Sequence, residues 1–255
     1  MGLVWTLIRQ YQIRSSGRDV STKNAMLAWT STLLPEHSVR NFTTDWNSGL
    51  ALCALVERIK PGSCPDYSNL DPQNGLANCE LGIRLAEEHF AIPRILEAAA
   101  LSNPNVDELS VMTYVSYFCK PANDNLMRWL RDTLPDRNIT NLTTDWNSGI
   151  NLAYLVDTIL PGSFPNWSQL NVADAVQNLD KAIDVAKKQL QVDPFIKAAQ
   201  MADPTVEELN QVIMLLRLQA VYKSIPNISC SGPGIMKAVV GLPASFRMDG
   251  ARLLT

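Results

Sequence analysis

The sequence predicts an all-α protein built from two copies of one domain, and three observations lead to this prediction. The segment Asn41–Gly49 (NFTTDWNSG) returns at residues 141–149 (NLTTDWNSG), and only Phe42 changes, to Leu142. Apolar residues recur at the i, i+3, i+4 and i+7 spacing of helices, and no stretch between residues 20 and 224 alternates as strands do. A period of about 100 residues is the size of a small domain rather than of a solenoid unit.

Four helices are expected in each copy. In the first copy they run roughly over residues 22–34, 47–60 and 74–90, and from Pro104 onward. The second helix has the most regular apolar stripe, which the second copy repeats residue by residue: Leu52, Leu55, Val56, Ile59, matched by Leu152, Leu155, Val156, Ile159. We expect all four tryptophans that recur at the 100-residue offset to be buried: Trp29, Trp46, Trp129 and Trp146.

A very short connection, Lys120–Asn123, separates the two copies. We place the domains at residues 20–120 and 122–224. Each copy is long enough to fold alone. Because the connection is so short, the two domains must touch or hold a restricted angle.

Composition excludes several classes of function. The formal net charge of −3 gives no electrostatic case for nucleic acid. The sequence has no apolar run of 18 residues that could span a membrane. Five cysteines without a C-x-x-C pair suggest free thiols in a reducing compartment, and two histidines make a His-built metal site improbable.

Catalytic motifs are absent as well. The chain has no phosphate-binding loop, nucleophile motif or metal-ligand spacing, so we expect no enzyme and no cofactor. Gly2 and Thr6 match the short N-myristoylation pattern, although the same residues also suit a helix fragment.

The central residues of both copies resemble a known family. Trp29, the run Asp45–Leu52 and the run Pro61–Tyr67 look like a calponin homology domain. The run Pro104–Ser116 is similar to the last helix of the second such domain in filamins and α-actinins. The second copy ends in the run Asn210–Leu216, which departs from that pattern.

The two ends of the chain resemble further parts of filamins. Residues 1–14 look like a remnant of the last helix of a first calponin homology domain, and residues 228–255 like the opening strands of an immunoglobulin-like repeat. That β segment is expected to be incomplete, because such a sandwich needs about seven strands. The order resembles the jitterbug-type branch of the filamin family, as a short isoform or a fragment from a partial gene model.

The resemblance implies binding to F-actin and actin cross-linking in the cytoplasmic actin cytoskeleton, with weak binding here because the first domain is truncated. In the family the contact surface uses the last helix of the first domain and the first helix of the second. Carried over to this sequence, these residues are Trp5, Thr6, Leu7, Ile8, Arg9, Gln10, Tyr11, Lys23, Met26, Leu27 and Thr30. The alternative is a cytoskeletal scaffold that binds other proteins or a membrane surface without appreciable actin affinity.

Overall fold

The computed structural model describes residues 18–225, and within that range every regular element is helical. The first copy holds α2 (Arg18–Leu33), α3 (Leu50–Ile59), α4 (Gly75–Phe90), α5 (Ala98–Leu101) and α6 (Glu108–Ser116). The second holds α7 (Cys119–Thr133), α8 (Ile150–Ile159), α9 (Ala175–Gln189), α10 (Ala198–Met201) and α11 (Glu208–Ser224). Short 3-10 turns link them: η1 (Pro35–His37), η2 (Thr44–Trp46), η3 (Tyr67–Asn69), η4 (Thr144–Trp146), η5 (Trp167–Gln169) and η6 (Val172–Asp174).

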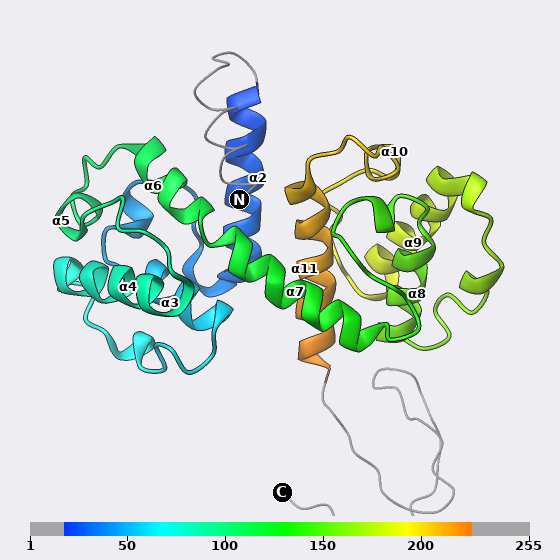
Figure 1. Cartoon of the computed structure of the whole chain (residues 1–255), viewed down its shortest axis with the longest axis horizontal. Helices are drawn as coiled ribbons and strands as arrows, with labels where there is room; N and C mark the ends of the chain where they lie inside the picture. Colours follow the sequence, from blue (N-terminus) through cyan, green and yellow to red (C-terminus); the bar gives the residue numbers. More distant parts are fainter. Residues whose placement is uncertain (1–17, 226–255) are drawn as a thin grey trace, which may run out of the picture.

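The prediction of two all-α copies with four main helices each is confirmed. The copies lie next to each other along the long axis of the molecule, and each is a cluster of helices around α3 or α8 (Figure 1). The expected remnant at residues 1–14 and the expected β segment at residues 228–255 lie outside the described residues.

The core of each copy is the apolar stripe on α3 or α8. Leu52, Leu55 and Val56 have no exposed surface, and α3 packs against α4 as α8 packs against α9. Helix α3 begins three residues later than predicted, because Gly49 has a φ of 74° in the left-handed region. A Cβ at residue 49 would lie 2.5 Å from the backbone nitrogen of Cys79, so this glycine also allows α4 to approach the start of α3 closely.

Three of the four tryptophans are fully buried as predicted: Trp29, Trp46 and Trp146. Trp129 is only partly buried, so the prediction was wrong for this residue. Its ring lies 5.5 Å from that of Tyr222, near the end of α11. Helix α2, which carries Trp29, packs extensively against α11 of the second copy, whereas within the described residues α7, which carries Trp129, packs less extensively against α11 and α3.

The connection between the copies is part of a helix rather than a loop. Lys120–Asn123 lies within α7, which follows α6 after the two residues Tyr117 and Phe118. Pro121 is tolerated there because the first backbone N–H groups of a helix have no intrahelical partner. The expected short link between two separate domains is therefore replaced by a helical junction.

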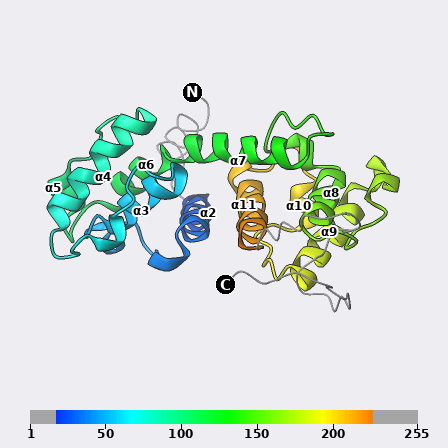
Figure 2. The same cartoon turned by 90° about the horizontal axis from the view of Figure 1, so that it is seen from below.

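The two copies touch along α2 and α11, which pack side by side. Figure 2 shows these two helices end-on, with α7 crossing over both of them. At the contact, Arg217 Nε donates a hydrogen bond to Thr32 Oγ1 at 3.4 Å. A second contact joins α7 to the end of α3, where Asn125 Nδ2 donates to the carbonyl oxygen of Ile59.

The residues of α11 explain why this helix departs from the pattern of the first copy. Ile213, one turn before Arg217, is fully buried, whereas the equivalent Thr113 of α6 is partly exposed. Apart from Asn210 and Arg217, every residue of α11 from 209 to 219 is buried. A helix that buries residues on all sides is enclosed by protein, and α11 packs against both its own domain and α2.

Candidate functional site

The nine-residue motif that appears twice is folded onto its own backbone. Asn41 Oδ1 accepts hydrogen bonds from the backbone N–H groups of Thr43 (2.9 Å) and Asp45 (3.2 Å). Asp45 Oδ2 accepts from the N–H groups of Arg40 (2.7 Å) and Asn41 (3.1 Å). Trp46 Nε1 donates to the carbonyl of Asn41 at 3.0 Å, and the second copy repeats these bonds.

Two asparagines then connect the motif to distant segments. Asn47 Nδ2 donates to the carbonyls of Leu101 (2.6 Å) and Asn103 (3.0 Å), at the end of α5. Asn78 Nδ2 donates to the carbonyls of Ser48 (2.9 Å) and Asp71 (2.8 Å). Asn147 and Asn178 do the same in the second copy. The repeated motif is therefore structural, because its polar groups are used to close loops.

The cysteines of the core are held as protonated thiols. All four cysteines within the described residues are free and buried: Cys53, Cys64, Cys79 and Cys119. Burial raises the pKa of the Cys79 and Cys119 thiols to about 12, so both stay protonated and unreactive at neutral pH. Within residues 18–225 no group of three His, Cys, Asp or Glu side chains could hold a metal ion.

The carboxylate of Asp145 shows how the motif uses charge. Partial burial opposes its ionisation, but the N–H groups of Thr140 and Asn141 donate to it and hold its pKa below the ordinary value. The second copy therefore depends on this ionised side chain to hold the start of its motif, and Asp145 is a structural residue.

The structure divides the predicted actin-binding residues into two sets. Residues 5–11 lie outside the described residues. On α2, Met26 and Thr30 have no exposed surface, and Thr30 Oγ1 donates back to the carbonyls of Met26 and Leu27 at 3.0 Å. Leu27 is partly buried against the core. Together with Lys23, these residues therefore share a helix without sharing an exposed face.

Among the predicted contact residues that the structure describes, Lys23 is the one that carries a charge. Its side chain is 36% exposed, and Nζ lies 2.7 Å from Glu108 Oε1 on α6. In the second copy the equivalent of Lys23 is Asn123, whose Nδ2 donates to Glu208 Oε1 at 3.1 Å. An ion pair in the first copy is thus replaced by an amide–carboxylate hydrogen bond in the second, and burial raises the pKa of Glu208 above its ordinary value.

Sequence reasoning missed Arg217, which joins three segments. Its Nη1 donates to the carbonyl of Asp193 at 2.5 Å, its guanidinium lies 5.8 Å from the ring of Phe195, and its Nε contacts Thr32 of the other copy. One signal in the sequence could have pointed to Arg217. The run Asn210–Leu216, which directly precedes it, differs from the corresponding residues of the first copy.

Comparison with known proteins identifies the domain. The calponin homology (CH) domain model matches residues 20–124 and 120–223. The chain therefore belongs to the calponin homology domain family, as the resemblance predicted. In residues 18–225, no helix has both the length and the apolar composition needed to cross a membrane.

The similar proteins include filamins. The chain is 36% identical over 129 residues to Filamin-C of Rattus norvegicus, and this match covers 47% of this chain and 5% of that protein. It is 35% identical over 129 residues to Filamin-A of Drosophila melanogaster, covering 46% of this chain and 6% of that protein. It is also 36% identical over 124 residues to Alpha-actinin-like protein 1 of Schizosaccharomyces pombe, covering 46% and 20% respectively. The matched region is thus a small part of each relative.

Proposed function

We propose that this chain is an F-actin-binding module of a filamin-type cytoskeletal protein, working in the cytoplasmic actin cytoskeleton without catalytic activity or cofactor. The observation that supports this most is the presence of two folded calponin homology domains in tandem, in a chain similar to filamins and to an alpha-actinin-like protein. The two units, which we place at residues 20–120 and 122–224, share a rigid helical junction, and this would hold a composite binding surface in a fixed shape.

The proposal also specifies that this chain binds F-actin weakly. Of the proposed contact residues on α2, Lys23 is already paired with Glu108, and Met26 and Thr30 are buried. We propose that Lys23 and Leu27 provide the contact from this helix, while Met26 and Thr30 hold the helix against its domain. Residues 5–11 would add to the same surface, and a complete preceding domain would add most of the affinity.

Co-sedimentation with F-actin tests the proposal. The comparison uses the 255-residue chain, a Lys23→Asn variant that carries the residue of the second copy, and a version extended by a complete first calponin homology domain. We expect weak pelleting of the parent, less of Lys23→Asn, and much more of the extended version. Because exposed charge contacts are screened, binding should fall as salt is raised from about 0.05 to 0.3 M.

One observation favours the alternative of a scaffold with little actin affinity. On α2, burial of Met26 and Thr30 and the packing of the helix on α11 leave few of its predicted contact residues accessible. If neither the parent nor the extended chain pellets with F-actin, the scaffold function is correct. If the parent binds as tightly as the extended chain, the proposal of weak binding is wrong while actin binding stands.

A further inference from the structure

The last helix of the second copy has one of its sides covered by the first copy. Arg217 Nε of α11 donates to Thr32 Oγ1 of α2 at 3.4 Å, and Ile213 and Leu209 lie one and two turns before Arg217 on the same side of the helix. Ile213 is fully buried, and Leu209 is 8% exposed. The side of α11 that meets α2 is therefore closed to solvent over its first half.

The equivalent side of α6 is partly exposed instead. Its residues are Leu109, Thr113 and Tyr117, which stand 100 positions before those of α11. Leu109 is 38% exposed, and Thr113 and Tyr117 are each partly exposed. Tyr117 directly follows α6 but keeps a helical backbone, so the three side chains lie along a line about 12 Å long. We call Leu109, Thr113 and Tyr117 the α6 open face.

A second molecule of this chain is a poor occupant of the α6 open face. Helix α2 presents small side chains such as Ala28 and Thr32 to α11, and this side of α2 is already used. At the equivalent positions α7 carries Arg128 and Asp132. Docking α7 of another molecule against Leu109 would take these charged groups out of water, which is unfavourable.

Residues 3–11 contain an apolar stripe that fits this face. Four apolar residues recur at the i, i+3, i+4 and i+7 spacing of one helix side: Val4, Leu7, Ile8 and Tyr11. A helix of these nine residues would be about 13 Å long, close to the length of the face. Where α11 carries Ile213, α6 carries the smaller Thr113, which leaves room for a larger side chain from the segment.

The chain between this segment and α2 is long enough for the contact. Lys23 Nζ lies 2.7 Å from Glu108 Oε1, so the start of α6 lies beside the first half of α2. Residues 12–17 span up to about 20 Å when extended. Ser15–Gly17 are residue types that favour turns, and a turn there would direct the segment back along α6.

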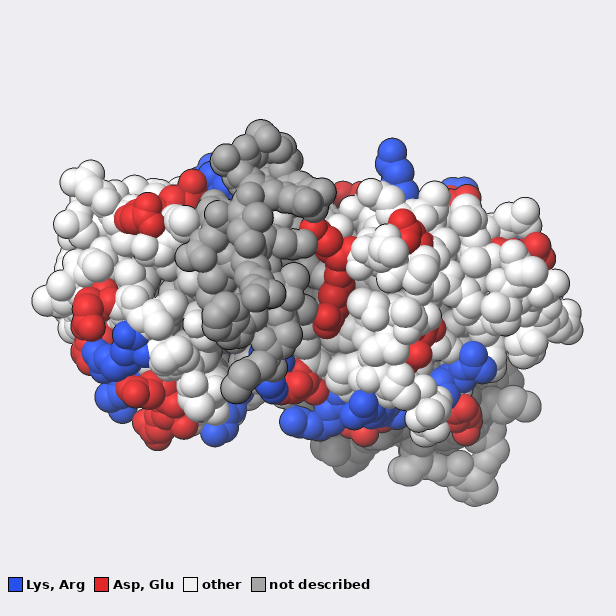
Figure 3. All heavy atoms as spheres, turned by 45° about the horizontal axis from the view of Figure 1, so that its top comes forward, with Lys and Arg blue, Asp and Glu red and all other residues white. Residues whose placement is uncertain are grey.

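The charges near the start of α6 also suit the segment. Asp107 is exposed at the N-cap of α6, where its carboxylate accepts from the backbone N–H of Ser110 at 2.8 Å. Residues 3–11 carry Arg9 and no acidic residue. Figure 3, in which the end of the molecule where α2 begins is turned forward, shows acidic side chains over its middle and upper part and basic ones mostly along its lower edge. A basic segment is attracted to such a surface.

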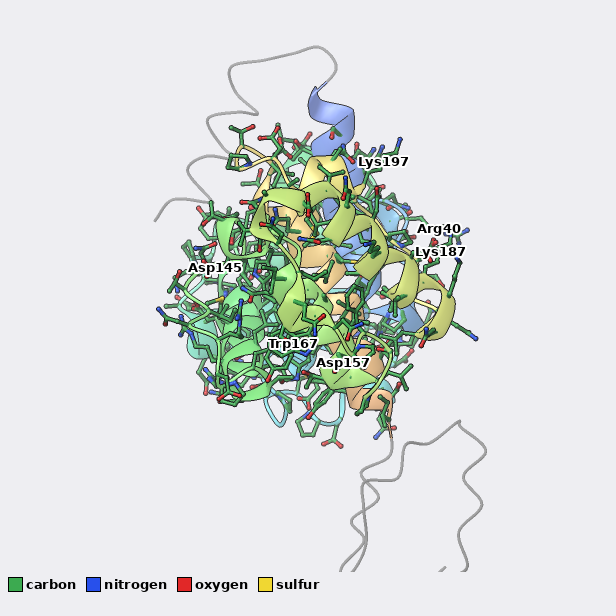
Figure 4. All side chains as sticks on the ribbon, turned by 90° about the vertical axis from the view of Figure 1, so that its right-hand side faces the viewer. Arg40, Asp145, Asp157, Trp167, Lys187 and Lys197 are labelled. Carbon is green, nitrogen blue, oxygen red and sulfur yellow. The ribbon has the colours of Figure 1, made fainter. Side chains whose placement is uncertain are left out.

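The outer side of the second domain suits the segment less well. It presents exposed cations, among them Lys187 and Lys197, which have the same sign as Arg9 (Figure 4). The exposed apolar residues Val172 and Val176 near the start of α9 form a pair only one turn long. Length, charge and reach therefore all favour the α6 open face.

We propose that residues 3–11 fold as a helix that docks on the α6 open face, as α2 docks on the equivalent side of α11. A free helix this short is marginal in water, so helix formation and docking occur together. Because residues 12–17 tether the segment near the face, its effective concentration there is high and a modest contact suffices. The docking does not depend on actin binding.

Hydrogen–deuterium exchange of the full chain, read by mass spectrometry on peptides that cover residues 3–11, tests the docking. In the parent we expect these backbone amides to exchange at least about tenfold more slowly than in a free peptide of the same sequence. Leu109→Asp should return the exchange to within about twofold of the free peptide. An acidic residue in the first turn of α6 suits the helix dipole, so the domain should stay folded, and circular-dichroism melting checks this.

Two further variants make the test specific. Leu76→Asp is the matched control, because Leu76 is 57% exposed in the same domain but lies on α4. Its exchange over residues 3–11 should equal that of the parent. Leu7→Asp changes the segment alone, so it replaces Leu109→Asp if that variant melts early. It should abolish the protection of residues 3–11 while leaving the melting of the two domains unchanged.

Three outcomes would overturn the docking. In the first, residues 3–11 of the parent exchange as fast as the free peptide. In the second, Leu109→Asp keeps the protection, or the Leu76→Asp control loses it equally. In the third, the protection depends on protein concentration and size-exclusion chromatography shows a dimer, which means that the segment docks on a second molecule. These measurements use no F-actin, so their failure leaves the proposed function to be decided separately by co-sedimentation.

Discussion

Asn78 offers the sharpest test of how the repeated motif stabilises the first domain. Its side chain is 4% exposed, and Nδ2 donates to two backbone carbonyls, those of Ser48 and Asp71, which belong to two different loops. Replacing Asn78 with Ala removes both donors and leaves both carbonyls without this partner. Each buried polar group left unpaired costs about 1–2 kcal/mol, so the free energy of unfolding should fall by about 2–4 kcal/mol.

Urea denaturation followed by circular dichroism and tryptophan fluorescence measures this loss. Asn178→Ala should show a similar loss in the second domain, because Asn178 Nδ2 donates to Ser148 (3.0 Å) and Asn171 (2.8 Å). Asn138→Ala is the control, since Asn138 is exposed and none of the described side-chain hydrogen bonds involves it. If Asn78→Ala costs no more than Asn138→Ala, the two loops are held by packing alone and the argument fails.

Two further predictions concern Glu208 and the tryptophans of the two domains. Burial raises the pKa of Glu208, and the hydrogen bond from Asn123 offsets part of this rise. The folded protein therefore binds the proton of Glu208 more tightly than the unfolded chain does. The free energy of unfolding should then increase as the pH falls through the raised pKa. Glu208→Gln should make the urea midpoint depend less on pH between about pH 4.5 and 7, without lowering the midpoint at pH 7. A marked fall of the midpoint at pH 7 would contradict the view that the buried charge of Glu208 destabilises the fold. Trp46→Ala should cost roughly 3–5 kcal/mol of unfolding free energy, whereas Trp129→Ala should cost less than half as much because Trp129 is only partly buried; equal losses in thermal melts would show that burial does not set the difference.

The sequence alone determined the repeat, the helical class and most of the core. A helix buries the side of its surface where apolar residues recur every three or four positions, so Leu52, Leu55 and Val56 could be assigned to the core without coordinates. The helix start at residue 50 was missed, because it depends on the left-handed backbone of Gly49 and on its close contact with α4, and such a contact exists only in the folded domain.

The tertiary structure decided which surfaces remain available. Arg217 contacts Thr32 across 185 residues of sequence, and no periodicity within one helix can reveal such a partner. The same packing covers one side of α2. Met26 and Thr30, on the side of α2 that faces its own domain, have no exposed surface either. Local spacing shows which side of a helix is apolar, but which sides of two equivalent helices stay accessible depends on how the two domains meet, and that is set by contacts far apart in the chain.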